Sequence, residues 1–135
     1  MNMKEFSKLK IFQDTYNASL TVMRDVANHL PDSERDAIEK PLLKAVKLIP
    51  ILIASGMAQK QNNERPTKLV QAAERCNEAI VALSYCRDLH PQKINSYLCK
   101  DLIDLYEKSA RILETTAGTE LMANVPKGGM NENWN

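Results

Sequence analysis

Three lysines, Lys40, Lys44 and Lys47, recur four and three residues apart within EKPLLKAVKLIPILIASGMAQ, residues 39–59. This spacing places their ammonium groups on one face of a helix, where they could bind the phosphates of a nucleic acid. A solvated helix face without a ligand is the alternative interpretation. No aromatic residue interleaves with the lysines, so the pattern favours backbone contact over base stacking. Four further basic residues complete the candidate nucleic-acid surface: Lys60, Arg65, Lys68 and Arg75.

Charge is distributed unevenly along the chain. The net charge of all 135 residues is +1. Between Lys40 and Arg75, however, seven basic residues stand against two acidic ones, so the remainder of the chain is net acidic. Dedicated nucleic-acid-binding proteins usually have a larger basic excess. The composition therefore predicts a local basic surface on a nearly neutral protein.

The other residues that could do chemistry form no catalytic pattern. Cys76, Cys86 and Cys99 are odd in number and lack CxxC spacing, which predicts buried, reduced thiols in a cytoplasmic protein. His29 and His90 fall near predicted helix ends, where capping is their expected role. The absence of Glu-x-x-His pairs argues against a ferritin-like di-metal oxidase. We therefore predict a protein that is not an enzyme and needs no metal or cofactor.

Breaks in the apolar pattern divide the chain into four predicted helices. The first, of about 22 residues, ends at Leu30-Pro31, because a residue before proline avoids the helical conformation. The second begins near Asp32-Ser33 and continues toward Gln59. The third begins near Pro66, and the fourth extends over about residues 92–116. One apolar stripe marks the first helix: Leu9, Phe12, Tyr16, Leu20, Met23, Ala27 and Leu30.

The segment that carries the lysines contains no charge-free stretch long enough to cross a membrane. Its longest charge-free stretch, residues 48–59, has twelve residues. Such a helix is about 18 Å long, against about 30 Å for the hydrocarbon core of a bilayer. Pro41 is expected in the first turn of a helical stretch, and Pro50 is expected to kink the helix. Gly56 is expected to allow a close approach of a neighbouring backbone or to mark fraying.

The third and fourth predicted helices have bundle-type patterns. In the third, Leu69, Ala73, Cys76, Ile80 and Leu83 are spaced four and three residues apart. The fourth has two adjacent apolar stripes, a width that predicts either self-association or a thick core within one chain. We expect residues 1–117 to form the bundle and residues 118–135, with Trp134, to form a flexible tail. The candidate interface residues are Leu98, Cys99, Leu102, Ile103, Tyr106, Ala110 and Leu113.

Four short motifs support a family resemblance. They are LKIFQ (residues 9–13), LPDSER (30–35), LIPILIASG (48–56) and LSYCRDL (83–89). With the helix breaks, they resemble the bacterial four-helix-bundle family that includes proteins encoded in intervening sequences of large ribosomal RNA genes. The same family includes the accessory variability proteins of diversity-generating retroelements. Leu52 and Ser55 stand where the family has Asn and Glu, so the chain resembles a divergent member.

The resemblance implies an antiparallel four-helix protomer with a kinked second helix, assembled as a homopentamer. It also implies contact with a reverse transcriptase and with RNA or DNA through basic surfaces. Combined with the residue patterns, it predicts an all-α, up-down-up-down four-helix bundle that serves as a non-catalytic accessory or scaffold protein. The alternative is a purely protein-binding adaptor that does not contact nucleic acid.

Overall fold

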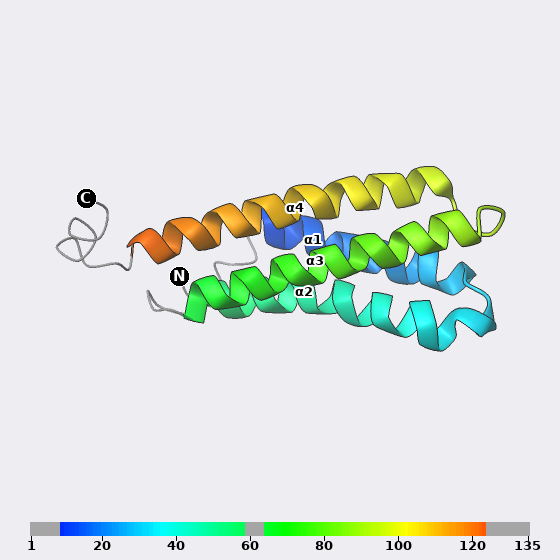
Figure 1. Ribbon diagram of the computed structural model, residues 1–135, viewed down its shortest axis with the longest axis horizontal. Helices are drawn as coiled ribbons and strands as arrows, with labels where there is room; N and C mark the ends of the chain where they lie inside the picture. Colours follow the sequence, from blue (N-terminus) through cyan, green and yellow to red (C-terminus); the bar gives the residue numbers. More distant parts are fainter. Residues whose placement is uncertain (1–8, 59–63, 124–135) are drawn as a thin grey trace.

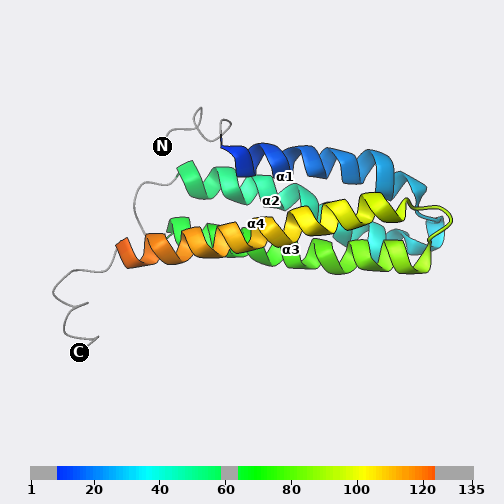
Figure 2. The ribbon, with the colours of Figure 1, turned by 90° about the horizontal axis from the view of Figure 1, so that it is seen from above.

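The computed structural model describes residues 9–58 and 64–123, and within them the chain is helical, with no strand. Four α-helices lie side by side along the long axis of the molecule (Figures 1 and 2). They are α1 (Lys10–Thr21), α2 (Lys40–Ala58), α3 (Glu64–Leu89) and α4 (Ser96–Ala123). The predicted all-α fold with four helices is confirmed.

The chain between α1 and α2 remains largely helical, as a series of 3-10 and π turns. A π-helical turn (Val22–Val26) and a 3-10 turn (Ala27–His29) extend α1 to the predicted break, where Leu30 is extended before Pro31. A 3-10 turn (Asp32–Glu34) and a π turn (Arg35–Glu39) then lead into α2. α2 begins at Lys40, directly after this π turn, so Pro41 lies in its first turn as predicted. Pro50 lies inside α2, with helical residues on both sides.

The last two helices are longer than predicted. α3 begins two residues before Pro66. The side chain of Asn95 caps α4 by accepting a hydrogen bond from the Leu98 N–H at 3.0 Å. α4 continues to Ala123. The first six residues of the predicted tail, 118–123, are therefore helical. The rest of that segment, with Trp134, lies outside the described residues.

The core gathers side chains from all four helices. α3 packs most extensively against α4 and α2, whereas α1 packs mainly against α2. The predicted stripe on α3 faces this core: its residues are buried, except that Ile80 is half-buried. The three cysteines are free and buried, as predicted. The largest completely buried side chains include Leu42, Ile49, Ile53, Leu69, Leu83, Tyr106 and Leu113.

The buried face of α1 differs from the apolar stripe seen in the sequence. Phe12, Leu20 and Met23 are only half-buried, and Tyr16 is 47% exposed. The core side of α1 carries smaller residues instead: Thr15, Ala18 and Ser19. The hydroxyl of Thr15 donates to the Ile11 carbonyl at 2.8 Å, and that of Ser19 to the Tyr16 carbonyl at 2.6 Å. These bonds within the helix satisfy the hydroxyls, so two polar residues can be buried against the core.

The interface residues predicted on α4 are mostly core residues, which corrects that assignment. One of the two apolar stripes of α4 is buried inside the chain: Cys99, Ile103, Tyr106, Ala110 and Leu113. In the other stripe Leu102 is buried, Leu98 and Leu105 are half-buried, and Ile112 is 42% exposed. Of the predicted interface residues, Leu98 alone is half-buried. The six others are buried within a single chain and have little surface to offer a second copy: Cys99, Leu102, Ile103, Tyr106, Ala110 and Leu113.

The stretch that contains α2 has the apolar composition of a membrane span, and one face of it is buried in the core. Asp32–Ala58 is the one stretch among the described residues that is long and apolar enough to cross a membrane. Leu42, Ile49 and Ile53 in this stretch are completely buried against other parts of the chain. A core helix of a soluble protein has the same composition.

A polar contact joins the two connections that lie at the same end of the bundle (Figure 1). His90 Nε2, just after α3, lies 2.8 Å from Glu34 Oε2, in the segment before α2. The side chains are only 20% and 19% exposed. The sequence pattern predicted a helix-capping role for His90. It contained no signal for the contact with Glu34, which is 56 residues away in the sequence.

Replacing Glu34 tests the contribution of this contact to stability. We expect Glu34→Ala to lower the free energy of unfolding by about 1–2 kcal/mol, because it leaves the part-buried imidazole without its partner. Urea denaturation measures the change. Glu107→Ala, at an exposed position on α4, is the control and should stay within about 0.5 kcal/mol of the wild type. Equal stability of the two variants would show that the contact does not stabilise the fold.

Candidate functional site around the outer face of α2

The predicted basic residues do not gather into one patch in the described part of the chain. Lys40, Lys44 and Lys47 are exposed on the outer ridge of α2. Lys40 is partly neutralised, because its Nζ lies 2.9 Å from Asp36 Oδ1. Within the described residues, Lys44 and Lys47 have no carboxylate at ion-pair distance.

The remaining basic residues have other surroundings. Arg75 Nη1 donates to both carboxylate oxygens of Glu78, at 2.8 and 2.7 Å. Arg65 is buried, and its Nη2 donates to the Met57 carbonyl at 3.4 Å, which ties the start of α3 to the end of α2. Lys68 is half-buried beside Gly56, and Lys60 lies outside the described residues. Lys44 and Lys47 therefore remain as the exposed, unpaired cations of the predicted set within the described residues.

A groove between α1 and α2 is the first of two apolar hollows beside this ridge. Its volume is about 510 Å³. We call it the α1–α2 groove. It is lined by Phe12, Tyr16, Ser19, Leu20 and Met23 on the α1 side and by Lys47, Pro50, Ile51 and Ala54 on the α2 side.

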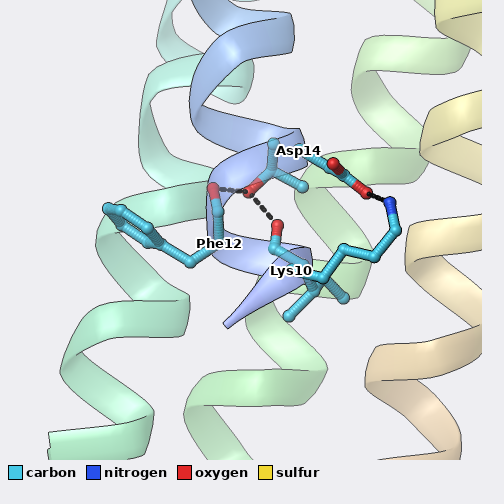
Figure 3. A network of polar contacts seen from close by, with 5 residues as sticks. Lys10, Phe12 and Asp14 are labelled. Atoms are coloured by element: carbon cyan, nitrogen blue, oxygen red, sulfur yellow. Dashed lines mark hydrogen bonds and ion pairs between the residues drawn. The ribbon is translucent and has the colours of Figure 1, made fainter. Parts of the chain in front are cut away.

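The aromatic residues of α1 form one wall of the α1–α2 groove. The rings of Phe12 and Tyr16 stack with their centroids 5.9 Å apart and their planes 16° from parallel. Figure 3 shows the Phe12 ring on the α2 side of α1, whereas Lys10 and Asp14 form an ion pair at 2.6 Å on the α4 side. Ile51, on the opposite wall, is 58% exposed. Large apolar side chains thus face solvent where the sequence pattern predicted a core.

A second hollow, the α2–α3 groove, lies on the other side of α2. It has a volume of about 460 Å³ and is lined in part by Pro41, Val81 and Tyr85. Val81 is 56% exposed and Tyr85 is 54% exposed. The α1–α2 groove adjoins α2 from Lys47 to Ala54, and the α2–α3 groove adjoins the start of α2 at Pro41.

The buried thiols have low reactivity. Burial, with a smaller effect of the Glu114 charge, raises the pKa of Cys76 from 9.0 to about 12. Burial also raises the pKa of Cys86 to about 12, with smaller contributions in the same direction from Cys99 and Glu34. A thiol with so high a pKa is a poor nucleophile at neutral pH, because the thiolate is the reactive form. These cysteines are therefore suited to packing and not to catalysis.

Two further observations concern chemistry in the described part of the chain. The Tyr106 hydroxyl is buried there without a hydrogen-bond partner, and burial raises its pKa. In those same residues, no group of three or more His, Cys, Asp or Glu side chains is placed to hold a metal ion. The two grooves and the two unpaired lysines are exposed features with binding potential.

Sequence reasoning located the lysine ridge but missed both grooves. A signal was present for the α1–α2 groove. Thr15 and Ser19 alternate with Phe12 and Tyr16 along the first helix, and small hydroxyl residues can occupy a tightly packed core face. The largest residues were assigned to the core because apolar size usually predicts burial.

No family model, no curated protein and no solved structure matches this chain.

Proposed function

We propose that this protein is a non-catalytic helical adaptor that binds a protein partner on the face formed by α2 and its two grooves. One observation carries the proposal: large apolar side chains, including Tyr16, Ile51, Val81 and Tyr85, remain about half exposed in two hollows beside one helix. Clustered apolar surface of this kind is typical of protein-binding sites. A cytoplasmic location and independence from metals and cofactors belong to the same proposal.

Nucleic-acid contact is the second candidate function. Lys44 and Lys47 support it, since both are exposed and neither is paired with a carboxylate in the described residues. Two cations give a small electrostatic contribution, and repetition of the chain in an oligomer would increase it. The family resemblance points in this direction, toward RNA or DNA and a reverse transcriptase as partners.

Finer features of the assembly are also proposals. We propose an up-down-up-down order of the helices, supported by the α1–α2 and α3–α4 connections that meet through Glu34 and His90. We propose that Pro50 bends α2, because its ring removes one intrahelical hydrogen bond. The homopentamer implied by the resemblance would need contacts other than those predicted on α4, since most of those residues are buried.

Site-specific photo-crosslinking in the native host tests the adaptor function. A photoreactive amino acid replaces Ile51, Val81 or, as a control, the exposed Asp104 on α4. We expect the same discrete protein adduct from Ile51 or Val81 and none from Asp104. The adduct should persist after nuclease treatment. Adducts of equal yield from all three positions would contradict a dedicated binding face.

A salt titration separates the two candidate functions. The purified protein is titrated with a structured RNA and a duplex DNA at several salt concentrations. The adaptor function predicts no tight binding. Binding that weakens steeply with salt, and that Lys44→Glu with Lys47→Glu abolishes, would favour the nucleic-acid function instead.

A further inference from the structure

We infer that the α1–α2 groove binds an amphipathic helix of a partner protein, with an apolar ridge for the groove and acidic residues for its rim. This inference rests on the proposed adaptor function and names the chemistry of the partner. It follows from the shape of the groove, the residues of its walls and the charges around it.

The dimensions of the groove fit a helix of about three turns. Its α1 wall runs from Phe12 to Met23, which is about 16 Å at 1.5 Å per residue. Apolar side chains three and four residues apart on a partner helix repeat along such a length. A groove between two neighbouring helices also offers the surface on which a further helix packs in a bundle.

The walls of the groove are built for an adaptable apolar contact. α1 turns Phe12 and Tyr16 toward the groove, buried Ser19 also lines it, and Thr15 is buried in the core. Tyr and Phe contribute large contact areas at low entropic cost, and Met23 can adapt its shape to different partners. Ile51 rises from the opposite wall and is 58% exposed, so it is placed to act as a central anchor.

The charges around the groove favour an acidic partner. Lys47 lines the groove itself, and Lys44 is exposed one turn away on the same ridge. Arg24 is exposed one turn beyond Leu20, and its Nε donates to the Leu20 carbonyl at 3.3 Å. No carboxylate of the described chain lines the groove. A partner helix with acidic residues beside its apolar ridge would therefore gain charge complementarity, whereas a basic one would be repelled.

The nearest carboxylates on the α2 side lie beyond the end of the groove. Glu39 is eight residues before Lys47, which corresponds to about 12 Å along a helix. Asp36 is farther away and is paired with Lys40. These groups leave the positive character of the rim intact where a partner helix would lie.

Fluorescence anisotropy with designed helices tests the inference. The probe is a labelled amphipathic peptide of about 15 residues, with leucine at positions three and four apart. One version has glutamate beside the leucines and the other has lysine at the same positions. We expect the full-length protein to bind the acidic peptide at least tenfold more tightly than the basic one. Nitrogen-15 NMR should show shift changes along Phe12 to Met23 and around Ile51.

Three variants separate apolar contact from charge and from nonspecific binding. Ile51→Glu should abolish binding of the acidic peptide. Lys47→Glu should weaken it about tenfold and improve binding of the basic peptide. Leu89→Glu is the matched control, since Leu89 is 56% exposed on α3 and lines neither groove, and it should leave binding unchanged. Circular dichroism and thermal unfolding verify that each variant is folded.

Several outcomes would overturn the inference. They are no binding of the acidic peptide, equal binding of both peptides, or loss of binding in Leu89→Glu and not in Ile51→Glu. Self-association that Ile51→Glu abolishes, without peptide binding, would assign the groove to a second copy of the chain. If crosslinking at Val81 still yields the partner adduct when the peptide does not bind, the adaptor function survives and only the acidic-helix inference fails.

Discussion

Replacing Gly56 with leucine is expected to lower the free energy of unfolding by about 3 kcal/mol, because a side chain at this position has no room. Gly56 is buried where α2 approaches α3. A Cβ built on it would lie 3.0 Å from the Cβ of Lys68 and 3.5 Å from both the Arg65 carbonyl oxygen and Leu69 Cδ2. The Cβ of Lys68 is fixed to the backbone, so a larger side chain must push the helices apart. Urea denaturation followed by circular dichroism measures the loss.

Gly118 provides a matched control within the same chain. It lies in α4, is exposed, and a Cβ built on it would have no neighbour within 4 Å. Gly118→Leu should therefore stabilise the protein by up to about 1 kcal/mol through helix propensity alone. Destabilisation of similar size at both positions would show that close packing of α2 on α3 is not the reason for glycine at position 56.

The second large effect is a loss of stability at alkaline pH. Burial raises the pKa of Cys76 to about 12 in the folded protein, from an ordinary value of 9.0. The unfolded chain therefore releases this proton near pH 9, while the folded chain keeps it. Stability contributed by the neutral thiol is complete below pH 9 and declines as the pH rises toward 12. The expected slope from Cys76 is about 1.4 kcal/mol per pH unit, and Cys86 adds a loss of the same sign.

Unfolding by urea at a series of pH values from 8 to 11, with a reductant present, measures this slope. Cys76→Ala leaves a small cavity and is expected to be less stable at neutral pH. The informative quantity is the slope of the unfolding free energy against pH. In the variant this slope should be shallower, because unfolding releases about one proton fewer. Parallel curves for the wild type and the variant would show that the Cys76 thiol does not control alkaline stability.

The sequence was sufficient to predict the helices but not their orientation about their own axes. Proline and capping residues act locally, so the break at Leu30-Pro31 and the start of α2 beside Pro41 follow from a few neighbouring residues. The face that α1 buries depends on what the other helices offer. Thr15 could enter the core because its hydroxyl bonds to the Ile11 carbonyl, and no periodicity argument contains that information.

The candidate site shows the same limit. The lysine spacing correctly placed Lys40, Lys44 and Lys47 on one exposed ridge of α2. Sequence proximity did not reveal that Asp36 pairs with Lys40 or that Arg65 is buried at the joint between α2 and α3. The wide apolar face of α4 left two interpretations open, and the interior of a single chain accounts for most of it.

The hydroxyls of Thr15 and Ser19 bond to carbonyls of their own helix. These two hydroxyls therefore do not tie α1 to the neighbouring helices. α1 also has the smaller share of the packing among the helices, so it is the segment best suited to open locally while α3 and α4 stay folded. A helix seated in the α1–α2 groove would brace α1 from its outer side. Partner binding and local folding of α1 would then be thermodynamically linked, and the partner would stabilise the part of the protein that is held least firmly.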